Sequence, residues 1–217
     1  EPGSADRLEA VARLINQGIL RGPEGDTDVQ LGAELLEPFS ESGHAHLRTL
    51  VASNLGSWEL DRENSSEAEA RLSGAFESAR ELNGPMPRLI HFNRIELRLR
   101  ARDLDGAEEL LANVEMIGEV APRDLMLRDT AEALLHLERG ALGRALHLVD
   151  IWAHVSLDAP VSFFPLLLVI ARTKAWSFAG RTDKAKAHYA LALQRGNHLP
   201  ATRALPTLLQ LGTDLRA

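Results

Sequence analysis

The sequence contains no cysteine among its 217 residues. Disulfides, thiolate metal sites and cysteine nucleophiles are therefore excluded, and a reducing, cytoplasmic setting is expected. Basic residues are also in the minority, since 24 Lys and Arg stand against 31 Asp and Glu and give a formal net charge of −7. Phosphate backbones and anionic membranes repel such a chain. We therefore expect neither direct nucleic-acid binding nor membrane binding.

Long apolar runs and catalytic motifs are missing as well. The longest nearly uncharged apolar run, 159–171, has 13 residues, whereas about 20 are needed to cross a bilayer. The sequence has no glycine-rich phosphate loop, no serine elbow and no His-Glu-x-x-His motif. Histidines and acids that share a helix face supply at most three ligands from one helix, whereas a closed zinc site needs four. We expect a protein that is not an enzyme and that has no cofactor and no metal site.

The residues that are present form a repeat. The segment 176–192 joins the end of an apolar helix, a Gly-Arg-Thr-Asp turn and a second helix, and partial copies of it occur upstream. The copies are anchored on alanines 39, 38 and 40 residues apart, namely Ala68, Ala107, Ala145 and Ala185. A period of this size is typical of stacked helical hairpins, which bury their apolar faces only against their neighbours.

Helical periodicity and turn residues divide the chain further. Residues 1–4 look like an expression-vector remnant, and 5–42 are expected to form a degenerate first hairpin or N-terminal cap. Four regular hairpins are predicted over 43–200, and a capping helix over 201–217. No segment reads as a strand, so the predicted fold is a single all-α domain. The helices are expected over 6–20, 26–36, 44–60, 66–82, 87–101, 104–117, 123–138, 141–155, 161–179, 182–195 and 201–215.

The repeats resemble the tetratricopeptide repeat. Leu55-Gly56 precedes Ala68 at the separation that the family pattern requires, and Gly140 and Gly180 each lie five residues before their alanine. The period exceeds the family's length of about 34 residues. This longer form is similar to the helical sensor domains of large bacterial transcription activators of the maltose-regulator type. The resemblance implies a right-handed superhelix of antiparallel hairpins, a TPR-like α-solenoid.

The resemblance also implies a binding role. The first helices of such a superhelix line a concave groove that holds a peptide, a partner protein or a small effector. We therefore expect a sensor or partner-docking domain of a larger bacterial regulatory or signalling protein. The alternatives are a stand-alone scaffold for protein assembly and, less favoured, a helical-repeat enzyme or enzyme subunit.

A basic stripe is the first candidate binding site. Arginines and a histidine recur at spacings of three and four on one predicted helix, and they are Arg88, His91, Arg94, Arg98 and Arg102. Residues with this spacing share one helix face, and arginine pairs well with the carboxylates or phosphates of a ligand. The alternative interpretation is a solvated face that pairs with acids nearby in the sequence.

Two asparagines are the second candidate. Asn54 and Asn93 lie 39 residues apart, at equivalent positions of two hairpins. The resemblance implies that asparagines here hold a peptide backbone, together with basic residues of neighbouring repeats. Ala131 and Ala171 stand at these positions in the later hairpins, so a complete clamp is not expected.

Apolar residues of the first helices are the third candidate. The resemblance implies that a row of them faces the groove, and this row comprises Leu50, Leu89, Phe92, Leu127, Leu134, Leu167 and Ile170. The alternative interpretation is that they are simply core. The segment 161–170 is apolar on nearly every side, so we also expect an interface at Phe163, Phe164 and Leu167. The C-terminal helix, a second copy in a homodimer, or a partner would cover it.

Overall fold

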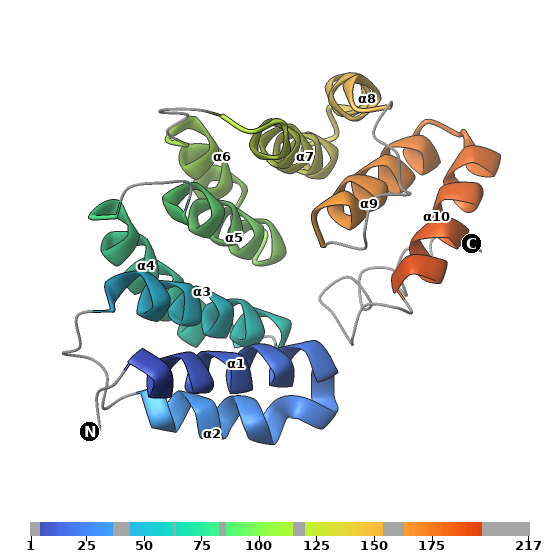
Figure 1. Ribbon diagram of the computed structural model, residues 1–217. Helices are drawn as coiled ribbons and strands as arrows, with labels where there is room; N and C mark the ends of the chain where they lie inside the picture. Colours follow the sequence, from blue (N-terminus) through green and yellow to red (C-terminus); the bar gives the residue numbers. More distant parts are fainter. Residues whose placement is uncertain are drawn as a thin grey trace. The chain divides into compact units, whose positions relative to one another are not determined.

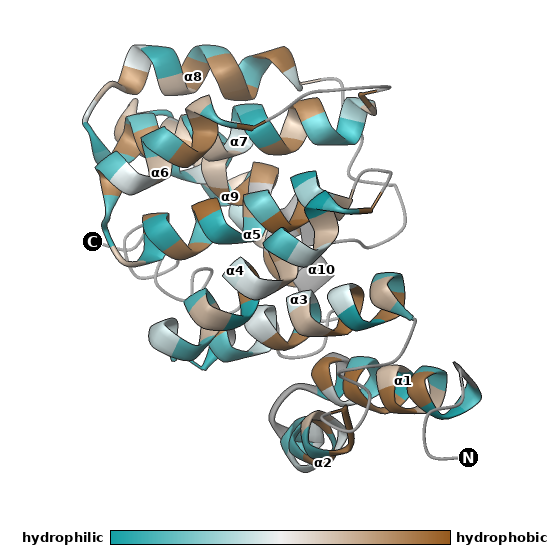
Figure 2. Cartoon of the chain, turned by 90° about the vertical axis from the view of Figure 1, so that its left-hand side faces the viewer, coloured by the Kyte–Doolittle hydropathy of each residue, from teal (hydrophilic) through white to brown (hydrophobic). Residues whose placement is uncertain are grey.

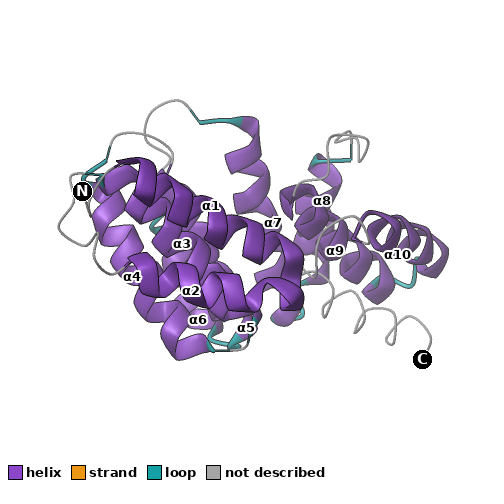
Figure 3. Ribbon diagram, turned by 60° about the horizontal axis from the view of Figure 1, so that its bottom comes forward, coloured by secondary structure: helices purple, strands orange, loops and turns teal. Residues whose placement is uncertain are grey.

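The computed structural model describes residues 5–36, 44–62, 64–82, 86–114, 120–153 and 163–196. Within these ranges every regular element is a helix (Figure 1), and no strand occurs (Figure 3). The predicted all-α class is therefore confirmed for this part of the chain. The elements, in chain order, are α1 (Ala5–Arg21), the 3-10 helix η1 (Gly22–Gly25), α2 (Asp26–Leu36), α3 (Ala45–Asp61), α4 (Ser65–Arg80), α5 (Met86–Arg100), α6 (Leu104–Ala112), α7 (Pro122–Glu138), α8 (Leu142–Ile151), α9 (Phe163–Phe178) and α10 (Thr182–Gly196).

The helices form because their apolar residues recur at helical spacing. In α4 the buried residues Ala68, Leu72, Ala75 and Ala79 follow one another at intervals of four, three and four, which places them on one side of the helix. Figure 2 shows hydrophilic and hydrophobic stretches alternating along the helices. Local signals mark some helix starts, because α7 begins at Pro122 and the Asp103 side chain accepts a hydrogen bond from the Gly106 N–H at the start of α6.

The chain divides into two compact units, Glu1–Leu97 and Arg98–Ala217, and the boundary falls inside α5. In the first unit α1 packs against α2 and α3, and α3 packs against α4. Leu8, Ile15, Val29, Val51 and Leu55 form one core between α1, α2 and α3, each with at most 1% of its surface exposed. Burying a side chain of this size contributes about 1.5–3 kcal/mol. A second core joins α3, α4 and α5.

In the second unit α6 packs against α7, α7 against α8, and α9 against α7, α8 and α10. The core lies between α7, α8 and α9, and several of its members are alanines. It comprises Met126, Ala133, Leu137, Ala145, Val149, Leu168, Ala171 and Ala175. Small side chains at these positions let the helices approach closely.

Four turns share one hydrogen-bond pattern. In each, a backbone N–H donates to the carbonyl oxygen five residues earlier, as in the turn that closes many helices. The pairs are Asn64 to Glu59 at 3.0 Å, Asp103 to Arg98 at 3.0 Å, Ala141 to His136 at 2.8 Å and Arg181 to Trp176 at 2.8 Å. Four residues after each donor stands an anchor alanine of the repeat, and all four alanines are fully buried. The sequence period is therefore present in the turns and in the helix contacts that follow them.

Two helices end four or five residues earlier than predicted. Helix α6 stops at Ala112 rather than continuing to residue 117, because the Asn113 N–H is shared between the carbonyls of Glu109 and Leu110, and asparagine has low helix propensity. Helix α8 stops at Ile151 rather than residue 155. There the carbonyls of Val149 and Trp152 accept hydrogen bonds from the Arg172 side chain of α9. A residue distant in the sequence therefore supplies donors to the carbonyls at the end of this helix. The C-terminal helix predicted over 201–215 lies outside the described residues.

Candidate functional site

Side-chain amides join the first helices of successive hairpins. Asn54 Nδ2 on α3 donates to Asn16 Oδ1 on α1 at 2.7 Å, and Asn93 Nδ2 on α5 donates to Ser53 Oγ on α3 at 3.4 Å. The three asparagines are half-buried, and Ser53 is 6% exposed. Helix α3 therefore carries one polar bridge to α1 and another to α5. We refer to these four residues as the amide ladder.

The amide ladder keeps spare hydrogen-bonding groups. A primary amide has two N–H donors and one carbonyl acceptor, and each bridge uses only one donor of Asn54 or Asn93. The Asn16 Nδ2 group and the Oδ1 atoms of Asn54 and Asn93 take no part in these bridges, and they have no hydrogen-bond partner in the described part of the chain. The ladder can therefore donate to ligand carbonyls and accept from ligand N–H groups.

Half-buried residues of α3 and α5 flank the ladder. Leu50 and Leu89 lie one helical turn before Asn54 and Asn93 and thus on the same helix faces. In helical projection, the positions of α3 between the two bridges are 46, 50, 57 and 61, and Leu50 and Ser57 are the two that lie within one turn of Asn54. This face is thus uncharged at the two positions nearest to Asn54, whereas His46 and Asp61 stand on the same face about two turns away.

Asn16 was missed by the sequence reasoning, which found only Asn54 and Asn93. A signal was present, because Asn16-Gln17-Gly18 and Asn54-Leu55-Gly56 share the pattern Asn-x-Gly at a separation of 38. Both glycines face a close neighbour. A Cβ on Gly18 would lie 2.6 Å from Val29 Cγ2, and one on Gly56 would lie 2.8 Å from Leu72 Cγ. The pattern therefore marks a close helix contact beside each asparagine.

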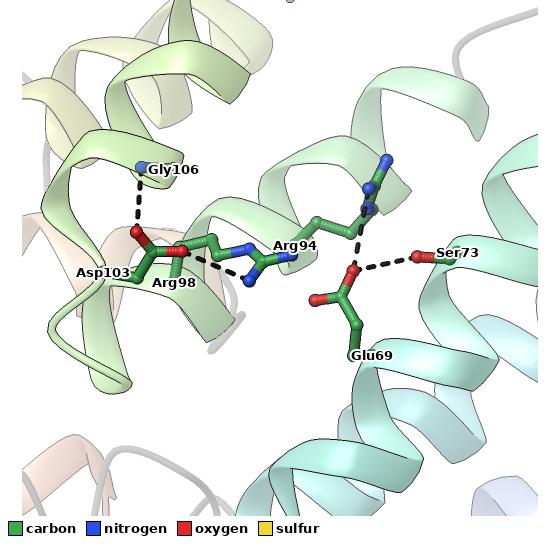
Figure 4. A network of polar contacts seen from close by, with 6 residues as sticks. All are labelled: Glu69, Ser73, Arg94, Arg98, Asp103 and Gly106. Atoms are coloured by element: carbon green, nitrogen blue, oxygen red, sulfur yellow. Dashed lines mark hydrogen bonds and ion pairs between the residues drawn. The ribbon is translucent and has the colours of Figure 1, made fainter.

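The middle of the predicted basic stripe packs against α4. Arg94 Nη2 lies 3.7 Å from Glu69 Oε1, and its guanidinium lies over the Phe76 ring, 5.2 Å from the ring centroid. Glu69 also accepts a hydrogen bond from Ser73 at 2.9 Å (Figure 4). His91 is 5% exposed and its ring lies 5.1 Å from that of Phe76. Arg94 and His91 thus face a neighbouring helix of their own unit.

The C-terminal end of the stripe contacts the turn after α5. Arg98 Nη1 lies 3.2 Å from Asp103 Oδ2, and this is the same carboxylate that caps α6 (Figure 4). Arg102 lies beyond the end of α5, in a left-handed backbone conformation with φ 58°, and pairs with Glu138 at 3.6 Å. Arg88, at the near end, is half-buried. The sequence interpretation of one continuous helical stripe is therefore wrong at Arg102.

The apolar candidates differ in exposure. Phe92 is 7% exposed, Leu127 4% and Ile170 3%, so in this conformation a ligand would reach little of them. Leu50, Leu89 and Leu134 are half-buried. For Phe163, Phe164 and Leu167, in the first turns of α9, the structure describes the backbone only, so the expected interface stays a prediction.

A buried polar cluster lies between α7, α8 and α9. Asp129, 6% exposed, accepts hydrogen bonds from Arg128 at 2.8 Å and from the Trp152 indole at 2.9 Å. Arg172, 3% exposed, is bound to the end of α8 through main-chain carbonyls. Burial lowers the pKa of Arg172, and the charge of Asp150 opposes that shift. These contacts hold the C-terminal end of α8 against α7 and α9.

His188 on α10 lies beside this cluster. Its ring stacks at a tilt on Trp176 of α9, with the centroids 4.6 Å apart. Burial lowers the pKa of His188, and the nearby charge of Arg172 lowers it further. Among the described residues, His188 Nε2 has no hydrogen-bond partner. The structure therefore favours the neutral imidazole.

The described residues contain no group of three His, Asp or Glu side chains arranged to hold a metal ion. Across the same residues, no helix combines the length and the apolar character needed to cross a membrane. No family model, curated protein or solved structure matches this chain.

Proposed function

We propose that the chain is a non-catalytic, tetratricopeptide-like binding module that holds a peptide segment of a partner protein against α1, α3 and α5. The observation that carries the proposal is the amide ladder, which bridges three first helices and keeps donors and acceptors to spare. Because a peptide backbone offers one N–H and one C=O per residue, such amides can bind it regardless of sequence. A role as the sensor or docking domain of a bacterial regulator belongs to the same proposal.

A right-handed superhelix of hairpins is the architecture that we propose with this function. Its support comes from the four equivalent turns, from the packing of α1 against α3 and from the hydrogen bond between Asn93 of α5 and Ser53 of α3. Stacked hairpins place successive first helices on one side. In such a stack, equivalent residues such as Asn16 and Asn54 recur along the same surface.

An internal peptide segment suits this face better than a terminal carboxylate. A carboxylate clamp needs free cationic side chains beside its asparagines. Arg94 and Arg98, which were candidates for that role, are paired with Glu69 and Asp103 within the chain. Binding through the main chain of an internal segment requires no such cation.

Selection from a random peptide library tests the proposal. The full chain is compared with a variant carrying Asn16→Ala, Asn54→Ala and Asn93→Ala, whose helix content is checked by circular dichroism. We expect selected peptides to bind the unaltered chain at least about tenfold more tightly, since each lost hydrogen bond contributes about 0.5–1.5 kcal/mol. Gln17→Ala is the control. It removes an exposed amide from α1, the helix that carries Asn16, and should leave the affinity for the peptides unchanged.

Equal affinity for the unaltered chain and the ladder variant would contradict the proposal. It would move the binding site away from α1, α3 and α5, and the predicted interface at Phe163, Phe164 and Leu167 would be examined next. Arg94→Glu is a poor choice for this test, because a second carboxylate beside Glu69 would disturb the contact between α4 and α5.

A further inference from the structure

The indole N–H of Trp58 is bonded to a carboxylate that also pairs with a cation. Trp58 Nε1 donates to Asp26 Oδ1 at 3.0 Å, and Arg62 pairs with Asp26 Oδ2. The Arg62 guanidinium also lies over the Trp58 ring, 4.8 Å from its centroid. The carboxylate thus joins the indole to the cation that stacks on it.

Trp152 is bonded to a carboxylate in the same way. Its Nε1 donates to Asp129 Oδ2 at 2.9 Å, and Arg128 Nη2 lies 2.8 Å from Asp129 Oδ1. Trp58 and Trp152 belong to different units of the chain. In each unit, therefore, one oxygen of the carboxylate accepts from an indole N–H and the other pairs with an arginine.

Around Trp176, the third tryptophan, a cation is present but no described carboxylate reaches the indole. Lys184 Nζ of α10 lies 5.7 Å from the centroid of the Trp176 ring, and Lys184 makes no ion pair in the described part of the chain. The Trp176 Nε1 atom is buried and has no hydrogen-bond partner there. His188, one turn after Lys184, stacks on the same ring, and its Nε2 atom is also buried without a partner. Buried polar groups are paired in the great majority of cases.

The charge of the surrounding hairpin favours an anion at this place. In a chain of net charge −7, the segment 163–196 has one acidic residue, Asp183, and six basic ones. The basic residues are Arg172, Lys174, Arg181, Lys184, Lys186 and Arg195. Lys174 pairs with Glu138 of α7 at 3.8 Å, whereas Arg181, Lys184 and Lys186 are exposed. A positive potential of this kind raises the local concentration of anionic ligands.

We propose that Trp176, Lys184 and His188 bind a carboxylate that a ligand supplies, either an acidic side chain of a peptide or a small free acid. One carboxylate oxygen accepts from the Trp176 indole N–H and the other pairs with the Lys184 ammonium, as in the two aspartate clusters. Neutral His188, in the tautomer protonated at Nε2, adds a donor. Lys184 is exposed and Trp176 is half-buried, so the lysine side chain can move as the ligand enters without disturbing the core.

Titrations of the 15N-labelled full chain with capped pentaglutamate and, separately, with glutarate test the inference. The three indole N–H signals report on the three tryptophans, and the Trp176 signal is assigned by its loss in Trp176→Phe. We expect this signal to move downfield to saturation. The signals of Trp58 and Trp152 should stay in place, because their N–H groups are already bonded. Saturation at a lower concentration of the peptide assigns the carboxylate to an acidic side chain, whereas saturation at a lower concentration of glutarate assigns it to a small acid.

Two lysine variants distinguish a defined site from a general positive field. Lys184→Gln should weaken binding of pentaglutamate about fivefold, as the loss of a partly exposed ion pair would. Lys186→Gln makes the same change of charge at an exposed position two residues on, which points away from the Lys184 side of the helix. It should weaken binding by less than about twofold. Equal effects of the two substitutions would show a general positive field and contradict the site.

Two further ligands test the chemistry of the group that is bound. Capped pentaglutamine should leave the Trp176 signal in place, and sodium sulfate at equal ionic strength should shift it far less than the carboxylates do. An equal shift with sulfate would overturn the assignment to a carboxylate, and a signal that no carboxylate moves would overturn the site itself. The amide ladder lies in the first unit, so the proposed function is decided separately by the peptide library.

Discussion

Arg102 occupies a backbone position that its counterparts in the next two hairpins give to glycine. Gly140 and Gly180 have φ values of 75° and 71°, and Arg102 has φ 58°. Each stands immediately before the residue whose N–H closes the turn. A side chain in the left-handed region costs roughly 1–2 kcal/mol, whereas glycine has no Cβ to clash.

We therefore expect Arg102→Gly to stabilise the protein by about 0.5–1 kcal/mol, after allowing for the larger entropy of glycine in the unfolded chain. The pair between Arg102 and Glu138 is solvent-exposed on the arginine side and contributes little. Differential scanning calorimetry should show a rise in Tm of roughly 1–4 °C. Arg102→Ala is the control, because it removes the side-chain charge but keeps the strained backbone. An equal rise for both variants would attribute the effect to charge instead.

His188 makes stability depend on pH. Its folded pKa is lowered from 6.5 by burial and then by the charge of Arg172, so the unfolded chain binds a proton more readily. The contribution of neutral His188 to the free energy of unfolding should accordingly be fully present above about pH 6.5. The free energy of unfolding should then fall as the pH drops from there toward the folded pKa of His188. Urea denaturation at pH 7.5 and at pH 5.5 measures the difference.

Two substitutions isolate the contribution of His188. His188→Gln should make the loss between pH 7.5 and 5.5 smaller, whereas His147→Gln, at an exposed position of α8, should leave the loss unchanged. A loss that is the same in His188→Gln and in the unaltered chain would assign the pH dependence to other groups.

At the scale of the helices, the alanines of the repeat control how closely the helices of a pair approach. Ala185 of α10 is fully buried at the contact with α9, whereas Ala187, two residues on, is exposed. Ala185→Leu should overpack the contact and cost roughly 1–3 kcal/mol, while Ala187→Leu should cost almost nothing. Comparing the Tm values of the two variants is the measurement, and equal shifts would contradict the assignment of Ala185 to the buried face.

Much of the fold could be predicted from local patterns in the sequence. Gly140 and Gly180 indicate left-handed turns because glycine adopts positive φ without strain, and the anchor alanines indicate helix contacts because small residues recur there. The turn at Arg102 has no such signal, since arginine gives no indication of positive φ. The early end of α8 depends on Arg172, which follows Trp152 by twenty residues. Contacts of that separation leave no local pattern to read.

The candidate site was only partly predictable for the same reason. Asn54 and Asn93 were found through their spacing, but their partners Asn16 and Ser53 depend on which helices pack together. The pairing of Arg94 with Glu69 is likewise a contact between helices. The spacing of basic residues on one helix cannot distinguish a ligand-binding stripe from a face that is committed to the neighbouring helix.

At the scale of the whole molecule, the question is how far a local disturbance spreads. In a stack of repeats each hairpin is stabilised mainly by its neighbours, so stability is approximately a sum of local and nearest-neighbour terms. A single cooperative domain behaves differently, because every strongly protected amide then exchanges through global unfolding. The two architectures therefore respond differently to the same substitution.

Hydrogen exchange measured by mass spectrometry on Ala185→Leu distinguishes the two responses. If the proposed stack is correct, protection should fall most in α9 and α10, less in α7 and α8, and remain unchanged in α1 and α3. Ala68→Leu, at the equivalent buried position of the first unit, should give the reverse gradient, with the largest loss in α3 and α4. Because the two substitutions alter the same kind of contact in different units, opposite gradients would follow only from nearest-neighbour coupling. A uniform fall along the chain in both variants would show one cooperative unit and contradict the stack.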